Sequence, residues 1–145
     1  MLLLDTNVIC ELIKAASDAA VLTWIDSVPP AECSIASITQ AELLAGVAFL
    51  PPGRRRDNVA LAIEAIFADL FRQRVLPFDS AAASAYAEIV ATRGRAGRPI
   101  SAFDAAIAAI ARSRGARLAT QNIGDFEGCG VDVVDPWTSR PDQPR

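Results

Sequence analysis

The stretch LLLDTN at residues 2–7 decides the fold class of this protein. Three successive leucines without polar alternation are typical of a strand that is buried on both faces, as in a parallel sheet. Asp5 follows at the carboxyl end of this strand, where open α/β sheets bind their ligands. Thr6 is then the expected N-cap of a helix that continues to residue 13. The stretch therefore predicts a parallel sheet with an acidic residue at its ligand-binding edge.

Short apolar runs and helical patterns continue to alternate along the chain. Further strands are predicted at residues 33–36, 75–77, 118–120 and 131–134. Such alternation predicts an α/β fold, here a three-layer α/β/α sandwich with a small, mainly parallel sheet. We expect one domain over residues 1–135, followed by a polar, proline-rich tail over residues 136–145 whose beginning Trp137 holds to the body.

Cap residues predict where several helices begin. The capping-box pattern S-x-x-Q at residues 37–40 would make Ser37 an N-cap and would place Glu42 in the first turns of its helix. Ser101 is expected to cap a later helix, with Asp104 three residues beyond it. Two more helices are expected to begin at Ser17 or Asp18 and at Asp79 or Ser80.

The composition limits the chemistry that is possible. The 145 residues include 17 acidic and 14 basic side chains and no histidine. Without histidine, neither a Ser/His/Asp nor a Cys/His nucleophile can be built, so a hydrolase must activate water with carboxylates or a metal ion. The net charge of −3 neither supports nor excludes a nucleic-acid partner.

The cysteines and the lengths of the apolar runs indicate a soluble, cytoplasmic protein. Cys10, Cys33 and Cys129 are odd in number and lack metal-binding spacing, so we expect small buried side chains in a reducing compartment. No apolar run is long enough to span a bilayer, and the first residues lack the pattern of a secretory signal. We therefore expect no membrane association.

Four acidic residues occupy positions that a parallel sheet can bring to one edge. Asp5 ends the first strand, Glu42 and Asp104 lie near helix starts, and Asp125 follows the strand that ends at Thr120. Carboxylates gathered in one crevice repel one another unless a cation neutralises them, and Mg²⁺ or Mn²⁺ suits such hard oxygen ligands. Acids are also common at helix starts and in turns, so the residue types alone leave structural roles open.

Four motifs of the chain resemble those of the PIN-domain family. They are LLDTNV at residues 3–8, SITQAELLAG at 37–46, SAFDAAIA at 101–108 and TQNIGDF at 120–126. Their order and spacing are similar to those of the family. Within the family, the chain resembles the VapC- and FitB-type toxin ribonucleases of type II toxin–antitoxin systems. The resemblance implies an α/β/α sandwich that hydrolyses RNA with Mg²⁺ or Mn²⁺.

Carried over residue by residue, the resemblance implies metal-binding catalytic roles for Asp5, Glu42 and Asp104, with Asp125 as the fourth acid. Some relatives place an acid where Asn122 stands here, so either Asn122 or Asp125 could face the metal. The negative charge favours Asp125.

Three further polar residues of these motifs are candidates for supporting roles. Thr6, Asn7 and Thr120, like Asn122 if it does not face the metal, could orient the carboxylates or a water molecule. Thr6 is equally well explained as a helix cap.

The resemblance also implies partners. An RNA substrate and a cognate antitoxin that covers the active site are expected, within a homodimer or a toxin–antitoxin hetero-oligomer. Arg93, Arg95 and Arg98 form a basic stretch that is a candidate for phosphate contacts, as are the arginines at residues 54–56. Both runs are also typical of solvated loops.

Two other classes of function remain open from the sequence. A PIN fold can serve as a binding module without catalysis, although the presence of all four acids argues against this. An Asp5 nucleophile of the phosphatase or receiver kind usually has another acid beside it, whereas Thr6 and Asn7 follow here. Cleavage of DNA instead of RNA would use the same metal and phosphate chemistry.

Overall fold

A parallel sheet with the strand order β3-β2-β1-β4-β5 forms the middle layer of residues 1–139, the part of the chain that this computed structural model describes. The strands are β1 (Leu2–Leu4), β2 (Cys33–Ala36), β3 (Val75–Leu76), β4 (Arg117–Ala119) and β5 (Val133–Val134). β1 is central and pairs with β2 and β4, so that Leu3 lies opposite Ser34 on one side and Leu118 on the other. All pairings are parallel.

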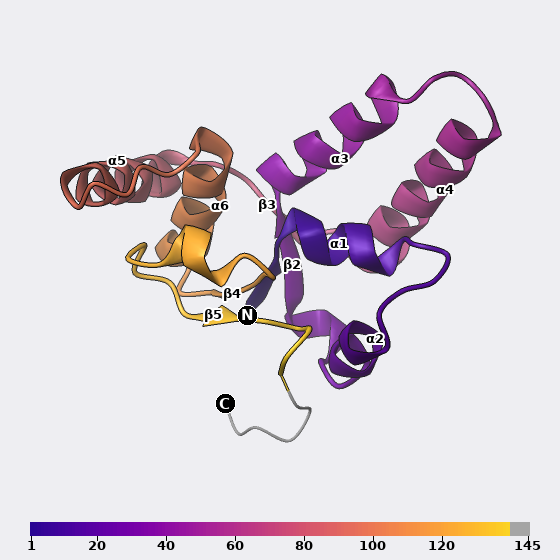
Figure 1. The fold of residues 1–145 in the computed structure, drawn as a ribbon, viewed down its shortest axis with the longest axis horizontal. Helices are drawn as coiled ribbons and strands as arrows, with labels where there is room; N and C mark the ends of the chain where they lie inside the picture. The colour runs from indigo at the N-terminus through magenta and orange to yellow at the C-terminus, as the bar shows by residue number, and fades with distance from the viewer. Residues whose placement is uncertain (140–145) are drawn as a thin grey trace.

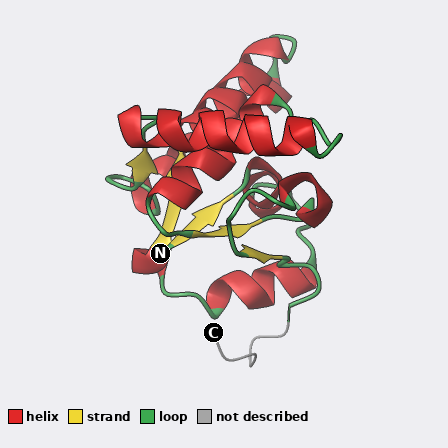
Figure 2. Ribbon diagram, turned by 90° about the vertical axis from the view of Figure 1, so that its left-hand side faces the viewer, coloured by secondary structure: helices red, strands yellow, loops and turns green. Residues whose placement is uncertain are grey.

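Helices cover both faces of this sheet (Figure 1 and Figure 2). They are α1 (Thr6–Leu12), α2 (Ala19–Asp26), α3 (Ser37–Phe49), α4 (Arg54–Asp69), α5 (Ser80–Arg95) and α6 (Ala102–Ser113). Two short 3-10 turns complete the described chain, η1 (Pro30–Glu32) and η2 (Ile123–Phe126). The helices α3 and α4 form a pair that projects from the body in Figure 1. The predicted three-layer sandwich is confirmed.

The leucine run of β1 is buried on both faces, as its unbroken apolar pattern predicts. Leu3 packs in one cluster with residues of α5 and α6, whereas Leu2 and Leu4 pack in another with residues of α1, α2 and α4. Successive side chains of a strand point to opposite faces, so this three-residue strand contributes to both cores. Asp5, immediately after it, is thereby fixed at the carboxyl edge in the middle of the sheet.

The predicted helix caps are partly right. Asp18, Asp79 and Ser101 are N-caps whose side chains accept main-chain N–H bonds. Thr6 is not a cap, because Asp5 takes that position and accepts from the Thr6 N–H. Nor does Ser37 begin a capping box, because the N-cap is Ala36 and the hydroxyl residue already lies inside α3.

The structure also bears on the predictions about the cysteines, membrane-spanning helices and the tail. Cys33 and Cys129 are buried, but Cys10 is exposed on α1, so the expectation of three buried thiols is wrong for Cys10. In residues 1–139 no helix combines the length and apolarity that a membrane span needs. Pro136 is buried and Trp137 packs against the cluster around Leu4. Residues 140–145 of the predicted tail lie outside the described part, and its boundary stays a prediction.

Replacing Leu3 with alanine is expected to lower the free energy of unfolding by about 2–5 kcal/mol, because a cavity remains in the middle of the sheet. The Leu3 side chain is 0% exposed, whereas Leu61 on α4 is 63% exposed and provides the matched control. Leu61→Ala is expected to change the same quantity by less than about 0.5 kcal/mol. Urea unfolding followed by circular dichroism measures both; equal losses would contradict the central position of β1.

Candidate active site

The carboxyl ends of β1, β2 and β4 bring distant segments of the chain together. Asp5 follows β1, α3 follows β2, and Thr120 follows β4. Because β1 lies between β2 and β4, both neighbouring segments flank Asp5. The parallel direction of the three strands places all these residues at the same edge.

Asp5 is held by a set of hydrogen-bond donors on both carboxylate oxygens. Its Oδ1 accepts from the Thr6 main-chain N–H at 2.8 Å. Its Oδ2 accepts from the Thr120 hydroxyl at 2.7 Å and from Asn7 Nδ2 at 3.4 Å. The carboxylate is almost completely buried, with the residue 5% exposed. Its orientation is therefore fixed before any ligand binds.

Thr120 and Asn7 join this carboxylate to the chain after β4. Asn7 Nδ2 also donates to Thr120 Oγ1 at 3.1 Å, and Asn7 Oδ1 accepts from the Gln121 main-chain N–H at 3.3 Å. The Asn122 N–H donates to Thr120 Oγ1 at 3.1 Å. The Thr120 hydroxyl thus accepts two bonds while it donates its proton to Asp5.

A second polar contact joins α1 to α3. The Thr6 hydroxyl donates to Glu42 Oε1 at 2.8 Å, and Thr39 Oγ1 lies 3.4 Å from Thr6 Oγ1. Thr39 is completely buried, whereas Glu42 is half-buried. Thr6 therefore fixes a second carboxylate near Asp5.

Asp104 approaches from α6. Ser101 Oγ accepts the Asp104 main-chain N–H at 3.1 Å, which fixes the first turn of this helix as predicted. The negative charge of Asp104 lies close enough to Asp5 to act on its titration, and so does that of Glu42. Three of the four predicted acids are therefore neighbours.

The electrostatic environment raises the pKa of Asp5 above its ordinary value of 3.8. Burial is the largest cause, and the charges of Asp104 and Glu42 act in the same direction. Hydrogen bonds from Thr120 and Thr6 act in the opposite direction and do not cancel the increase. Glu11 is a contrast: its hydrogen bond from Lys14 lowers the pKa. Among residues 1–139, no ion pair joins a basic side chain to Asp5.

The fourth acid stands apart from this group. Asp125 lies in η2 and is exposed, and none of the hydrogen bonds or ion pairs of the described residues joins it to Asp5, Glu42 or Asp104. Asn122, the alternative, is the exposed N-cap of η2, and only its main-chain N–H contacts the polar group, through Thr120. The choice between Asp125 and Asn122 stays a prediction.

The donor set suits a hard divalent cation, although it does not form a closed cage. Within residues 1–139, no group of three or more acidic or cysteine side chains is gathered tightly enough to enclose a metal ion. Mg²⁺ needs no such cage, because it keeps several water ligands and usually takes only one or two carboxylates from the protein. A buried carboxylate with a raised pKa and two acidic neighbours fits this requirement.

The family model described as the PIN domain matches residues 2–127. The chain belongs to the PIN domain family. It is 41% identical to the VapC ribonuclease Y4jK of Sinorhizobium fredii, over 94% of this chain and 98% of that protein. The resemblance inferred from the four motifs is confirmed.

Solved structures agree with this assignment. The crystal structure of FitAcB from Neisseria gonorrhoeae has a TM-score of 0.89 to this PIN domain at 37% identity, covering 96% of this chain and 100% of the other. VapBC-5 from Mycobacterium tuberculosis, a member of the VapBC family of toxin–antitoxin systems, has a TM-score of 0.69 at 26% identity. The match covers 92% of this chain and 96% of the VapBC-5 chain.

The arginine stretches of this PIN domain differ from the expected loops. Arg93 is buried near the end of α5 and bonds to main-chain carbonyls, so it is not available for phosphate contacts. Arg95 and Arg98 are exposed. The run at residues 54–56 forms the first turn of α4 and does not lie in a loop. The sequence pattern placed these side chains on the surface but could not reveal that one of them turns inward.

Sequence reasoning also missed two residues beside the acids. Thr39 was absorbed into the mistaken capping box, although its spacing of three residues before Glu42 was a usable signal. Cys10 is exposed as a residue, but partial burial of its thiol and the charges of Glu42 and Asp5 raise the pKa of that thiol. One helical turn and a half separates Cys10 from Asp5, which places it near the acidic edge.

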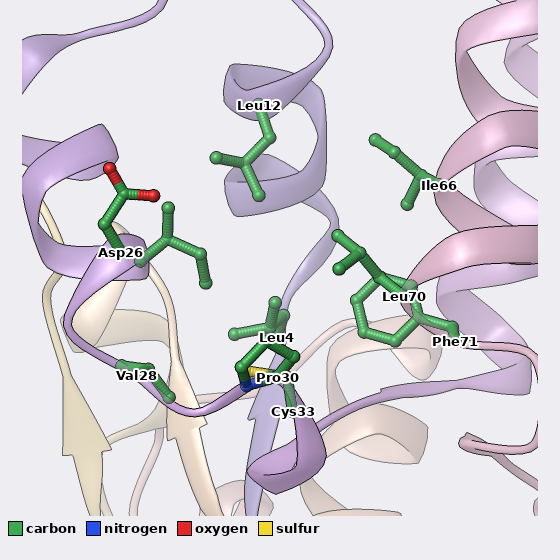
Figure 3. Close-up of a pocket in the computed structure, with 10 residues that line it drawn as sticks. Leu4, Leu12, Asp26, Val28, Pro30, Cys33, Ile66, Leu70 and Phe71 are labelled. Atoms are coloured by element: carbon green, nitrogen blue, oxygen red, sulfur yellow. The ribbon is translucent and has the colours of Figure 1, made fainter.

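A separate apolar cavity of about 370 Å³ lies between α1, α2, α4 and the sheet (Figure 3). Its walls include Leu4, Leu12, Ile25, Ile66, Leu70 and Phe71. Asp26 is the one acid among the residues that line it, and none of the four predicted site acids does so. The cavity and the acidic edge are therefore different surfaces of the molecule.

The metal-free protein is expected to lose stability as pH rises. Asp5→Asn should remove the part of this loss that comes from ionisation of Asp5. The folded state raises the pKa of Asp5 above 3.8. The stability that protonated Asp5 contributes is therefore fully present below that pH and is lost as pH rises through the folded pKa. Asparagine does not titrate. Between about pH 4 and pH 7, the free energy of unfolding of the variant should therefore increase relative to that of the wild type.

Urea unfolding in EDTA at several pH values measures this difference. Asp69→Asn, which removes an exposed acid from the end of α4, is the charge-matched control. A difference between Asp5→Asn and wild type that stays constant with pH would contradict the burial argument.

Proposed function

We propose that this protein is a metal-dependent endoribonuclease and the toxin of a type II toxin–antitoxin module. Membership of the PIN domain family supports a nuclease, and the relative named VapC ribonuclease supports RNA as the substrate. The observation that carries the mechanism is the buried Asp5 carboxylate, whose pKa is raised by burial and by two acidic neighbours. The alternative, a binding module without catalysis, would show no metal-dependent cleavage of RNA.

Asp5, Glu42 and Asp104 are the residues that would hold a Mg²⁺ or Mn²⁺ ion, with Asp125 as the proposed fourth. The bound ion would supply positive charge that favours ionisation of water and offsets the negative charge that develops on the phosphate. Hard oxygen donors without sulfur or imidazole favour these ions over zinc. Cys10 is nearby, but its raised thiol pKa disfavours the thiolate that zinc would need.

Side chains of the protein itself orient the acids and can accept the proton. Thr120 and Asn7 keep the Asp5 carboxylate in one orientation, and Thr6 does the same for Glu42. Such preorganisation means that the acids need not rearrange when the substrate phosphate arrives. Because the chain has no histidine, the proton released by the attacking water passes to a carboxylate or to solvent.

We further propose a cognate antitoxin as the partner, in the cytoplasm. The support is the similarity to VapBC-5, a member of a family of toxin–antitoxin systems. An antitoxin arginine would find carboxylates without a paired cation at the acidic edge, because no ion pair within the described part of the chain includes Asp5. A homodimer or a hetero-oligomer with the antitoxin is the proposed assembly.

Addition of MgCl₂ or MnCl₂ is expected to raise the melting temperature of the wild type. A ligand at 100 times its dissociation constant stabilises the folded state by about 2.7 kcal/mol. Asp5→Asn and Asp104→Asn should lose most of this increase, whereas Asp69→Asn should retain it. Comparing Asp125→Asn with Asn122→Ala identifies the fourth ligand. Thermal unfolding measures all of them, and equal increases in every variant would contradict the proposed metal site.

Asp104→Asn is expected to lower the rate of RNA cleavage at least about 100-fold, since it removes a charge that would hold the ion. The measurement uses a single-stranded RNA and a DNA of the same sequence, each with Mg²⁺, with Mn²⁺ or with EDTA. Asp69→Asn is the folded control. Undiminished cleavage by folded Asp104→Asn would remove this acid from the mechanism, and cleavage of the DNA alone would exclude ribonuclease action.

A further inference from the structure

Two arginines connect the end of α5 to the turn η2 that carries Asp125. Arg93 Nε donates to the Arg98 carbonyl oxygen at 2.7 Å, and Arg93 Nη1 donates to the Glu127 carbonyl oxygen at 2.5 Å. The guanidinium of Arg93 therefore joins the end of α5 to Glu127, which lies 34 residues further along the chain. The bridge also closes the turn after α5, because the Arg98 N–H donates back to the Arg93 carbonyl at 2.9 Å.

Arg93 is unusual because it is buried without an acidic partner. The residue is 7% exposed, and none of the ion pairs of the described residues includes it. A buried charge is costly unless its donors are satisfied, and an apolar side chain could fill the same space without that cost. What the guanidinium adds is directional contact with two carbonyl groups, so its role is to connect these segments.

Arg98 adds a second set of contacts to the same turn. Its Nη1 lies 2.7 Å from Glu127 Oε2, and its Nη2 donates weakly to the Gly124 carbonyl at 3.5 Å. Contacts to Gly124 and Glu127 are contacts to the residues on either side of Asp125 and Phe126. The two arginines therefore bracket the segment that holds the fourth acid.

The bracketed turn needs such support. η2 has four residues and its N-cap makes no side-chain hydrogen bond. Phe126 anchors it in the core beside α6, but a single buried ring does not fix the direction of the neighbouring Asp125. On the other side of the bridge, Arg98 precedes Ser101, the cap of the helix that carries Asp104. The arginines thus tie the turn of Asp125 to the approach of the Asp104 helix.

We propose that Arg93 and Arg98 form a clamp that positions Asp125 relative to Asp104. This inference rests on the proposed function, because it assigns the clamp to the same active site. Arg98 acts through Glu127 and the turn, and it does not contact the RNA. The clamp restrains the turn that carries Asp125, since no hydrogen bond or ion pair of the described residues joins Asp125 to the other acids. Its loss leaves the core intact and affects the rate of cleavage more than the binding of RNA.

A charge-swap experiment on the exposed pair tests the clamp without disturbing the buried Arg93. The variants are Arg98→Glu, Glu127→Arg and the double variant that exchanges both residues. Each single variant should lower kcat about tenfold, with KM for a single-stranded RNA changed by less than about twofold. The double variant should recover at least about half of the wild-type kcat, because the pair is restored with its charges exchanged. Arg72→Glu, an exposed charge reversal outside the clamp, is the matched control.

Failure of the double variant to recover would overturn the clamp, because it would mean that Arg98 acts on something other than Glu127, such as a phosphate. A rise in KM without loss of kcat would overturn it for the same reason. The single variants should also be tested in an Asp125→Asn background. There Arg98→Glu should cause little further loss, and an undiminished further loss would show that the arginine does not act through Asp125.

Amide hydrogen exchange separates the clamp from the proposed function. Exchange at residues 122–128 should become at least about fivefold faster in each single variant and should return towards the wild-type rate in the double variant. This result does not depend on cleavage. Absence of RNA cleavage by the wild type, with this exchange pattern, would refute the proposed function and leave the clamp in place. Unchanged exchange in the single variants would refute the clamp itself.

Discussion

The structure depends on the carboxylate of Asp5, which is buried and forms no ion pair with any basic side chain of residues 1–139. Asp5 ends the central strand, so its position follows from the same three leucines that build both cores. Burial and the charges of Glu42 and Asp104 oppose its ionisation, while Thr6, Asn7 and Thr120 compensate in part with hydrogen bonds. Natural proteins accept such local instability mainly where a ligand relieves it. The fold thus holds uncompensated negative charge at a fixed position.

The surrounding hydrogen bonds explain how the fold tolerates the buried Asp5 carboxylate. Thr120 comes from the strand beside β1, and the Asp5 main chain itself bonds to Ala119 at 2.9 Å. Thr6 joins the start of α1 to Glu42 on α3. Each carboxylate is thus oriented by an element that the sheet has already positioned. The parallel topology sets the distances between segments, and short hydroxyl side chains set the directions of the acids.

The sequence predicted the parts of this arrangement that are local. The leucine run, Asp5 at its end, and the caps Asp18, Asp79 and Ser101 follow from patterns within a few residues. The errors concern choices between local and distant partners. Thr6 could cap a helix or bond to Glu42, and only the packing of α1 against α3 decides this. Arg93 looks like part of a basic surface stretch until the chain after η2 provides carbonyls for it.

The four acids also differ in how the chain holds them, and this explains the weakest part of the site. Asp5, Glu42 and Asp104 stand at a strand end or in a helix, where main-chain ladders and caps fix them. Asp125 stands in a four-residue turn that lacks a side-chain cap. Restraining such a turn needs contacts from elsewhere, and the guanidinium groups of Arg93 and Arg98 provide them on both sides of the acid. A turn restrained from outside can be adjusted or released without disturbing the sheet, whereas Asp5 cannot move without β1.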